Sequence, residues 1–274
     1  MSDPRLTPAT DRVVADWRAA EFPALTPVAP EAMQVGQPVV DLCRAPEGAR
    51  DRQLVQGAVF EVLEQRDGWA FGIAPMLGHY CGWVREDALG GAPRSAGHWL
   101  AVRQSHAYPA PDFKQHETCA ISHGAQLACF ESAGRFTRTD LGWVPTRHLT
   151  DATIDDPVKT AELYLGVPYL WGGNSIWGID CSGLALAGCL HAGIDCPGDS
   201  DMQARDLGET LPPGTPPRRG DLMFWKGHVA WVADAETLLH ANAFHMATAY
   251  EPIVEAIARI DAQGDGPVTR HARL

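Results

Sequence analysis

An internal repeat constrains the fold of residues 35–150 more than any other feature of the sequence. The segment that begins at Gly57 (GAVFEVLE) aligns with the segment that begins at Gly124 (GAQLACFE), 67 positions later. Downstream, Gly82-Trp83-Val84 aligns with Gly142-Trp143-Val144, 60 positions later, so the first copy holds seven extra residues around 72–80. Both copies consist of short β-type runs broken by Gly, Pro and Asp. The repeat predicts two small all-β barrels in tandem, over residues 35–92 and 93–150.

Composition and charge exclude several classes of protein. A chain of 274 residues, 45% hydrophobic and 20% charged, is long enough for two or three small folded domains. No apolar run approaches the roughly 18 residues that a membrane-spanning helix needs. The formal net charge of −12 and the lack of a basic cluster argue against nucleic acid and membrane surfaces as partners. The N-terminal segment does not have the pattern of a secretory signal, so the cytoplasm is the expected location.

The cysteines indicate packing residues rather than a disulfide framework. They are odd in number and include no CxxC pair, which argues against disulfides and against a zinc ribbon. Their positions are Cys43, Cys81, Cys119, Cys129, Cys181, Cys189 and Cys196. The spacing of Cys189 and Cys196 around His191 fits no common pattern of metal ligands. We therefore expect no metal site, and a packing role for six of the seven.

The segments on either side of the repeat show helical patterns. Residues 1–34 predict a short helix with Val13, Val14 and Trp17 on one face, followed by a proline-rich extended arm. From about residue 151 the pattern predicts a helix at 155–165, a helix at 181–192 that is apolar on nearly every face, and antiparallel strands within 222–241. Gly193 is placed to end the second helix. The whole chain is therefore predicted to be two all-β barrels followed by an α+β domain at 151–274.

One cysteine and two histidines have the spacing of a nucleophilic site. Cys181 opens the predicted buried helix, where backbone N–H groups and the helix dipole favour a thiolate and can stabilise an oxyanion. Such a nucleophile needs an imidazole base, which in turn needs an orienting polar group. His228 begins one predicted strand and His240 ends the next, a separation that suits neighbouring strands of a hairpin. We assign Cys181 as nucleophile, His228 as general base and later general acid, and His240 as the orienting residue.

Each of these residues alone has a structural interpretation. A free buried cysteine is most often an inert packing residue. Strand-end histidines are commonly hydrogen-bonded for packing. The combination of the three residues at this spacing favours the catalytic interpretation.

The C-terminal segment resembles the NlpC/P60 family of papain-like cysteine peptidases, and the repeat resembles bacterial SH3 (SH3b) domains. Five pieces match the NlpC/P60 pattern in the family's order. They are Tyr169-x-Trp171-Gly172-Gly173, Asp180-Cys181-Ser182-Gly183, Arg219-Gly220-Asp221-Leu222-x-Phe224, Gly227-His228-Val229-x-x-Val232 and His240-Ala241. With the repeat included, the resemblance covers about 240 of the 274 residues.

The resemblance implies further site residues. Asp180 and Ser182 would help to hold the substrate's free ammonium and its D-Glu portion, although Asp180 would equally serve as a helix cap. Tyr169 would present its hydroxyl near the oxyanion, with a core aromatic as the structural alternative. Tyr80 of the first barrel would reach into the site, and its structural alternative is an exposed barrel tyrosine. The family also uses an acidic residue of the first barrel, which we expect within 50–53.

The same resemblance implies an activity. Proteins that combine tandem SH3b domains with an NlpC/P60 domain include γ-D-glutamyl-L-diamino acid endopeptidases. The implied reaction is hydrolysis of the γ-D-Glu–diamino acid bond of murein stem peptides with a free N-terminal L-Ala, in cell-wall peptide recycling, without metal or organic cofactor. An amidase or acyltransferase on the same scaffold and a non-catalytic binder of wall peptides are the alternatives. The sequence leaves open the choice between diaminopimelate and lysine, the length of the stem peptide and the oligomeric state.

Overall fold

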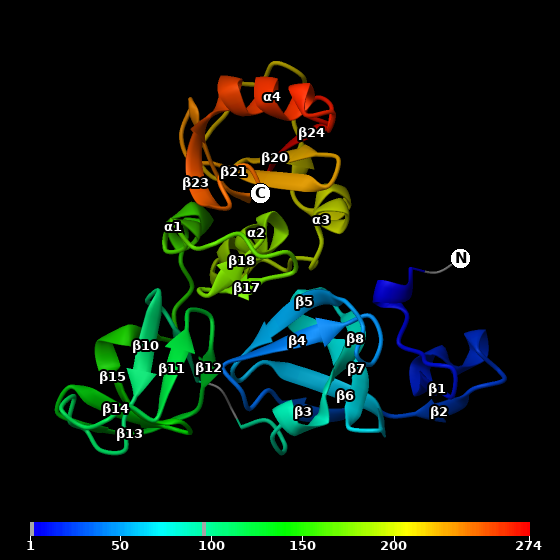
Figure 1. The fold of residues 1–274 in the computed structure, drawn as a ribbon, viewed down its shortest axis with the longest axis vertical. Helices are drawn as coiled ribbons and strands as arrows, with labels where there is room; N and C mark the ends of the chain where they lie inside the picture. Colours follow the sequence, from blue (N-terminus) through cyan, green and yellow to red (C-terminus); the bar gives the residue numbers. More distant parts are fainter. Residues whose placement is uncertain (1–2, 95–96) are drawn as a thin grey trace. The chain divides into compact units, whose positions relative to one another are not determined.

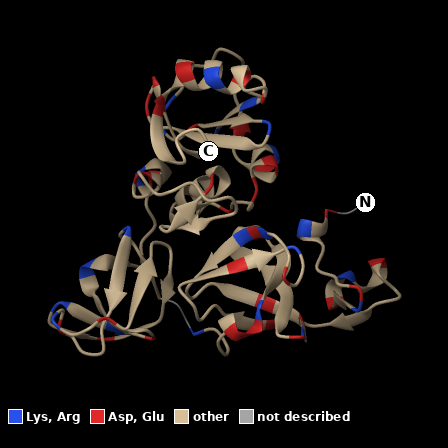
Figure 2. Cartoon of the chain, viewed as in Figure 1, with Lys and Arg blue, Asp and Glu red and all other residues tan. Residues whose placement is uncertain are grey.

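The chain folds into two compact units, Met1–Asp151 and Ala152–Leu274 (Figure 1). The computed structural model describes residues 3–94 and 97–274. The division lies one residue beyond the predicted start of the α+β domain. Within the described residues, no helix is long and apolar enough to cross a membrane. Basic residues are dispersed among acidic ones (Figure 2).

An antiparallel six-stranded sheet forms the first barrel region. Its order is β3-β6-β7-β8-β4-β5. The strands are β3 (Glu31–Gln34), β4 (Val39–Cys43), β5 (Arg50–Val55), β6 (Val59–Arg66), β7 (Trp69–Ala74) and β8 (Tyr80–Arg85). A cluster that includes Trp69, Phe71 and Trp83 packs on this sheet. Because β3 pairs with β6 along its whole length, residues 31–34 belong to the sheet and not to the predicted N-terminal arm.

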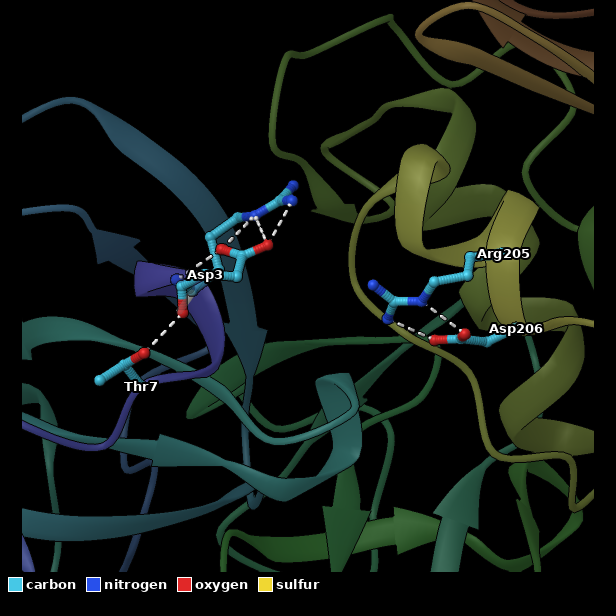
Figure 3. A network of polar contacts seen from close by, with 5 residues as sticks. Asp3, Thr7, Arg205 and Asp206 are labelled. Atoms are coloured by element: carbon cyan, nitrogen blue, oxygen red, sulfur yellow. Dashed lines mark hydrogen bonds and ion pairs between the residues drawn. The ribbon is translucent and has the colours of Figure 1, made fainter. Parts of the chain in front are cut away.

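The predicted N-terminal helix over Val13 to Trp17 is wrong. Val13–Ala15 is a strand, β1, which pairs in parallel with β2 (Thr26–Val28). Two β-branched residues in succession favour an extended backbone, and the strand buries Ala15 in the cluster on the first sheet. A 3-10 helix, η2 (Asp16–Glu21), follows, and Trp17 is 57% exposed rather than packed on a helical face. Ahead of β1, the carbonyl of Asp3 accepts a hydrogen bond of 2.7 Å from the Thr7 hydroxyl (Figure 3).

The second copy of the repeat folds into three small antiparallel sheets, β10-β11, β12-β9-β16 and β13-β14-β15. Its strands are β9 (His98–Leu100), β10 (Gln104–Ala107), β11 (Cys119–Ser122), β12 (Gln126–Leu127), β13 (Cys129–Ala133), β14 (Phe136–Thr139), β15 (Gly142–Pro145) and β16 (Leu149–Thr150). Their shared core includes Leu100, Ile121 and Val144.

Corresponding landmarks of the two copies have the same local structure. Gly57 and Gly124 have φ of +82° and +80°, and each lies in the turn that precedes a strand. Glycine is the residue that adopts this left-handed conformation without steric cost. The Gly-Trp-Val pieces lie in β8 and β15, and a 3-10 turn follows each: η4 (Glu86–Ala88) and η5 (Thr146–His148). The extra residues of the first copy contain a further 3-10 turn, η3 (Pro75–Leu77).

The second unit is built on a six-stranded antiparallel sheet with the order β19-β24-β20-β21-β22-β23. Its strands are β19 (Glu209–Thr210), β20 (Leu222–Trp225), β21 (His228–Val232), β22 (Thr237–Asn242), β23 (Ala247–Pro252) and β24 (Arg270–Arg273). The helices are α1 (Pro157–Glu162), α2 (Cys181–His191), α3 (Ser200–Asp206) and α4 (Ile253–Ala262). Figure 1 shows α4 beside this sheet, where its apolar side chains share a core with β20, β21 and β22. The predicted strands within 222–241 are confirmed.

Both predicted helices of this unit exist, and the first is shorter than expected. Asp156 caps α1 by accepting a 3.1 Å bond from the Val158 N–H. After Glu162 the backbone bonds shift to the tighter three-residue spacing, as in the bond from Leu163 N–H to the Thr160 carbonyl, so the α-helix ends there. The second helix, α2, ends at His191, and Gly193 follows with φ of +71°.

A buried carboxylate links two neighbouring strands of this sheet. Asp221, just before β20, is 1% exposed and accepts two bonds of 2.7 Å from the Arg273 guanidinium and one of 2.9 Å from His271. Burial opposes ionisation, but the bonds from Arg273, the Arg218 N–H and His271 outweigh it and lower the pKa of Asp221. The Asp221–Arg273 pair therefore links β20 to β24 within the sheet.

We expect Asp221→Ala to destabilise the second unit by about 1–3 kcal/mol, because the Arg218 N–H, His271 and Arg273 would lose a buried hydrogen-bond acceptor. The matched control is Asp206→Ala, which removes the partner of Arg205 in an exposed pair of 2.7 Å (Figure 3). Surface pairs contribute about 0–1 kcal/mol. Denaturant unfolding followed by tryptophan fluorescence measures both changes. Equal losses in the two variants would contradict the role given to Asp221.

Candidate active site

Cys181 is the first residue of α2, as the sequence predicts. Asp180 is the N-cap, and its Oδ1 accepts a 2.7 Å bond from the Gly183 N–H. The cysteine side chain is buried. Its sulfur therefore lies at the positive end of a helix, where a thiolate is stabilised.

The Asp180 carboxylate also fixes the loop before the helix. Its Oδ1 accepts a bond of 3.0 Å from the Ser182 hydroxyl, and its Oδ2 accepts one of 2.9 Å from the Gly172 N–H. The next residue, Gly173, packs so closely that an added Cβ would lie 2.5 Å from the carbonyl oxygen of Gly178. The capping interpretation of Asp180 is confirmed, whereas its contact with a substrate ammonium stays a prediction.

The two predicted histidines lie side by side. The Nε2 of His228, on β21, and the Nδ1 of His240, on β22, are 2.9 Å apart, and the two strands pair in antiparallel register. His240 is fully buried and His228 is half-buried. Burial lowers the pKa of both imidazoles, and the charge of Arg259 lowers both further. Both rings are therefore neutral at pH 7, so His228 is able to accept a proton.

Packing links the helix of Cys181 to the strands of the histidines. The helix α2 packs against both β21 and β22. The Trp231 indole on β21 donates a 3.2 Å bond to the Leu184 carbonyl, within the first turn of α2. Cys181 and the two imidazoles are thus carried by elements of one packed core.

Two further residues extend the histidine pair, and the sequence reasoning missed both. Glu251, on β23, lies with its Oε2 2.9 Å from His240 Nε2. Arg259, on α4, donates bonds of 2.8 and 2.7 Å to the two oxygens of that carboxylate. Burial raises the cost of the Glu251 charge, but the bonds from Arg259 and His240 lower its pKa to about 2. No local motif marks Glu251 or Arg259. The pairing of β22 with β23 brings Glu251 to the site, and the packing of α4 on the sheet brings Arg259.

The residues implied by the resemblance occupy different environments. Tyr169 is half-buried, and its N–H donates a 2.9 Å bond to the Met246 carbonyl. Ser182 is buried beside Asp180. Tyr80 begins β8 in the first unit and is 1% exposed, so the structural alternative of an exposed barrel tyrosine is wrong. Within 50–53, Asp51 pairs with Arg44 at 2.7 Å. The roles of Tyr169, Ser182 and Tyr80 toward a substrate stay predictions.

One group of side chains has the geometry of metal ligands but not the chemistry. Ligand atoms of His240, His245 and Glu251 lie within 4.8 Å of one another. Both nitrogens of His240 already take part in hydrogen bonds, and Arg259 bonds to both oxygens of Glu251. A divalent cation here would be repelled by the adjacent guanidinium. The group therefore fits a hydrogen-bonded relay better than a metal centre.

Comparison with known proteins identifies the two kinds of domain. Residues 166–257 match the NlpC/P60 family, and residues 42–89 match the bacterial dipeptidyl-peptidase Sh3 domain. The chain thus carries an N-terminal bacterial SH3 domain and a C-terminal NlpC/P60 domain, as the sequence resemblance predicts. A crystal structure of an NlpC/P60 family protein from Bacillus cereus ATCC 10987 shares the fold, with a TM-score of 0.74 and 19% identity over 89% of this chain and 99% of that one.

The curated relatives are peptidases by name. Over 97 residues, the chain is 35% identical to the gamma-D-glutamyl-L-lysine dipeptidyl-peptidase of Bacillus subtilis (strain 168). Over 90 residues, it is 37% identical to the dipeptidyl-peptidase 6 of Lysinibacillus sphaericus. Each alignment spans 32% of this chain and 32% of the relative, so the chain matches about a third of the length of these proteins.

We expect iodoacetamide at pH 7 to modify Cys181 at least tenfold faster than the cysteines of the first unit. Burial raises the pKa of the Cys43, Cys119 and Cys129 thiols and that of Cys81 to about 12, so these four stay protonated. Peptide mass spectrometry after timed labelling gives each rate. His228→Ala should slow the labelling of Cys181 alone. A Cys181 rate no higher than that of Cys129, in the presence of His228, would argue that the thiol is an inert packing group.

Proposed function

We propose that this protein is a cysteine endopeptidase that hydrolyses the γ-D-Glu–diamino acid bond of murein stem peptides with a free N-terminal L-Ala, and that it acts in cell-wall peptide recycling in the cytoplasm. The observation that carries the proposal is the 2.9 Å contact between His228 and His240, on strands that pack against the helix opened by Cys181. The names of the curated relatives support the bond that is cleaved. The proposal includes a papain-like fold for residues 151–274 and a second SH3b domain at 93–150.

The proposed reaction has two steps and needs no cofactor. His228 takes the thiol proton, and the Cys181 sulfur attacks the γ-carbonyl carbon of D-Glu. Backbone N–H groups at the start of α2 would stabilise the oxyanion, with the Tyr169 hydroxyl beside them. The C–N bond breaks as His228 donates its proton to the leaving amine, which leaves a thioester. Water, deprotonated by His228, then attacks the thioester carbon. The C–S bond breaks, the Cys181 sulfur recovers the proton from His228, and L-Ala-D-Glu is released.

Charge complementarity supports the choice of a free N-terminus. A substrate ammonium that loses its hydration in a cleft must be paired with an acceptor. In the proposal, Asp180 and Ser182 supply acceptor oxygens from the NlpC/P60 domain. Tyr80 and an acidic residue within 50–53 are the proposed contributions of the first SH3 domain.

The test compares matched substrates and matched cysteine variants. We expect the wild-type protein to release free diamino acid from L-Ala-γ-D-Glu-meso-diaminopimelate or from its L-Lys counterpart, and not from the N-acetylated forms. Cys181→Ala should lose at least a thousandfold in kcat/KM, since the nucleophile is absent. Cys189→Ala, a change to a fully buried thiol of the same helix, should keep near wild-type activity. Mass spectrometry identifies the products.

Other outcomes of this experiment point to the alternatives. Equal cleavage of free and N-acetylated peptides would indicate an open cleft and overturn the proposed specificity. Hydrolysis of an N-acyl substrate instead of the isopeptide would favour an amidase. Binding of the peptide without turnover by wild type and Cys181→Ala alike would favour a non-catalytic wall-peptide binder.

A further inference from the structure

Four side chains form one line of contacts that begins at His228 and ends at Arg259. His228 contacts His240 at 2.9 Å, and His240 contacts Glu251 at 2.9 Å. Arg259 closes the line with bonds of 2.8 and 2.7 Å to the Glu251 carboxylate. The four residues come from β21, β22, β23 and α4. His240 and Glu251 are 0% and 6% exposed, so water competes little for these bonds.

The carboxylate determines which nitrogen of each imidazole holds a proton. An ionised Glu251 only accepts hydrogen bonds, so the proton on His240 lies on Nε2. A neutral His240 then has its lone pair on Nδ1, and it accepts from the Nε2–H of His228. A neutral His228 that has its proton on Nε2 has its lone pair on Nδ1. The nitrogen of His228 that is not bonded to His240 is therefore the basic one.

Arg259 is needed for this placement of the protons because it keeps His240 neutral. A buried carboxylate with histidine as its sole partner would favour an imidazolium beside it. A protonated His240 would donate from Nδ1 to Nε2 of His228, and the proton of neutral His228 would then move to Nδ1. The base required by the proposed mechanism would be lost. The Arg259 guanidinium supplies the positive charge that compensates the Glu251 carboxylate, so His240 does not have to be protonated.

The titratable and charged groups that face His240 come from three neighbouring elements and one loop. His228 faces it from β21, Glu251 from β23 and Arg259 from α4. His245, in the loop after β22, lies with its ring 6.4 Å from that of His240 and bonds to Asn242. The Arg259 guanidinium also lies 4.6 Å from the centre of the Phe244 ring, which covers it from the same loop.

We propose that Glu251 and Arg259 are positioning residues that set the tautomer of His228 through His240, and so make Nδ1 of His228 the base for Cys181. This inference rests on the proposed roles of Cys181 and His228. It goes beyond them by assigning the direction of every hydrogen bond in the relay and by giving a function to an ion pair that touches neither substrate nor nucleophile.

The first experiment changes the cation and follows the pH dependence of Cys181. We expect Arg259→Met to slow alkylation of Cys181 by iodoacetamide at least tenfold at pH 6.5. The rate should recover toward wild type as the pH is raised, because His240 loses its extra proton. Arg259→Lys keeps a cation and should restore most of the rate at pH 6.5. Glu251→Gln should lower the rate without recovery at high pH, since a neutral amide can donate to His240 as well as accept from it.

The matched control removes a comparable ion pair that has no contact with the relay. Arg273→Met leaves Asp221 without its arginine, so it should cost stability yet keep the wild-type pH profile of alkylation. Parallel profiles for Arg259→Met and Arg273→Met would reduce Arg259 to a structural role and overturn the inference. Because alkylation is measured without a peptide, it separates failure of the relay from failure of the proposed peptidase function.

A direct measurement on the wild-type protein removes any dependence on folding of the variants. Long-range proton–nitrogen NMR of ¹⁵N-histidine-labelled protein reports which ring nitrogen is protonated, and His228→Gln assigns the signal. We expect His228 to be protonated on Nε2 and unprotonated on Nδ1 at pH 7. The opposite tautomer would overturn the inference even if the enzyme cleaves its peptide.

Discussion

The need to compensate buried carboxylates governs the second unit. An ionised carboxylate is costly to bury unless it is paired and fully hydrogen-bonded. Asp221 meets this requirement with Arg273, Glu251 with Arg259, and Asp180 with two backbone N–H groups and one hydroxyl. The hydrogen bonds to each carboxylate join segments that are distant in sequence or that form different elements. The loop before α2, the start of α2, the β20–β24 pair, β23 and α4 are therefore held by polar contacts as well as by the apolar core.

The local elements that carry Cys181 and the histidines could be predicted from the sequence because short-range signals define them. An apolar run bounded by an acidic cap and a glycine predicts α2, and alternation with short turns predicts β21 and β22. Glu251 and Arg259 could not be found in this way. Their role depends on strand pairing, which brings Glu251 from 11 positions beyond His240 to its ring, and on the packing of α4, which brings Arg259 from 19 positions beyond His240 to that carboxylate.

The helix predicted in the N-terminal segment was wrong for the same kind of reason. Val13 and Val14 have a spacing that suits a helix with Trp17, yet they join a parallel pair with Thr26–Val28. The partner strand lies beyond a 3-10 turn, so the residues next to the valines in sequence do not indicate where it is. In the repeat, by contrast, conformational signals are local: Gly57 and Gly124 each occupy a left-handed turn, and the two copies could be aligned on them.

The state of the other thiols has a consequence for the chemical durability of the chain. All seven cysteines are free, so the fold does not depend on a disulfide. Peroxide attacks thiolates rather than thiols, and burial keeps four cysteines of the first unit in the thiol form. These residues are thereby protected from the sulfenic and sulfinic states that would introduce polar oxygen into the packed first unit. Under the proposed function, oxidative inactivation would begin at Cys181, while the folded first unit persisted.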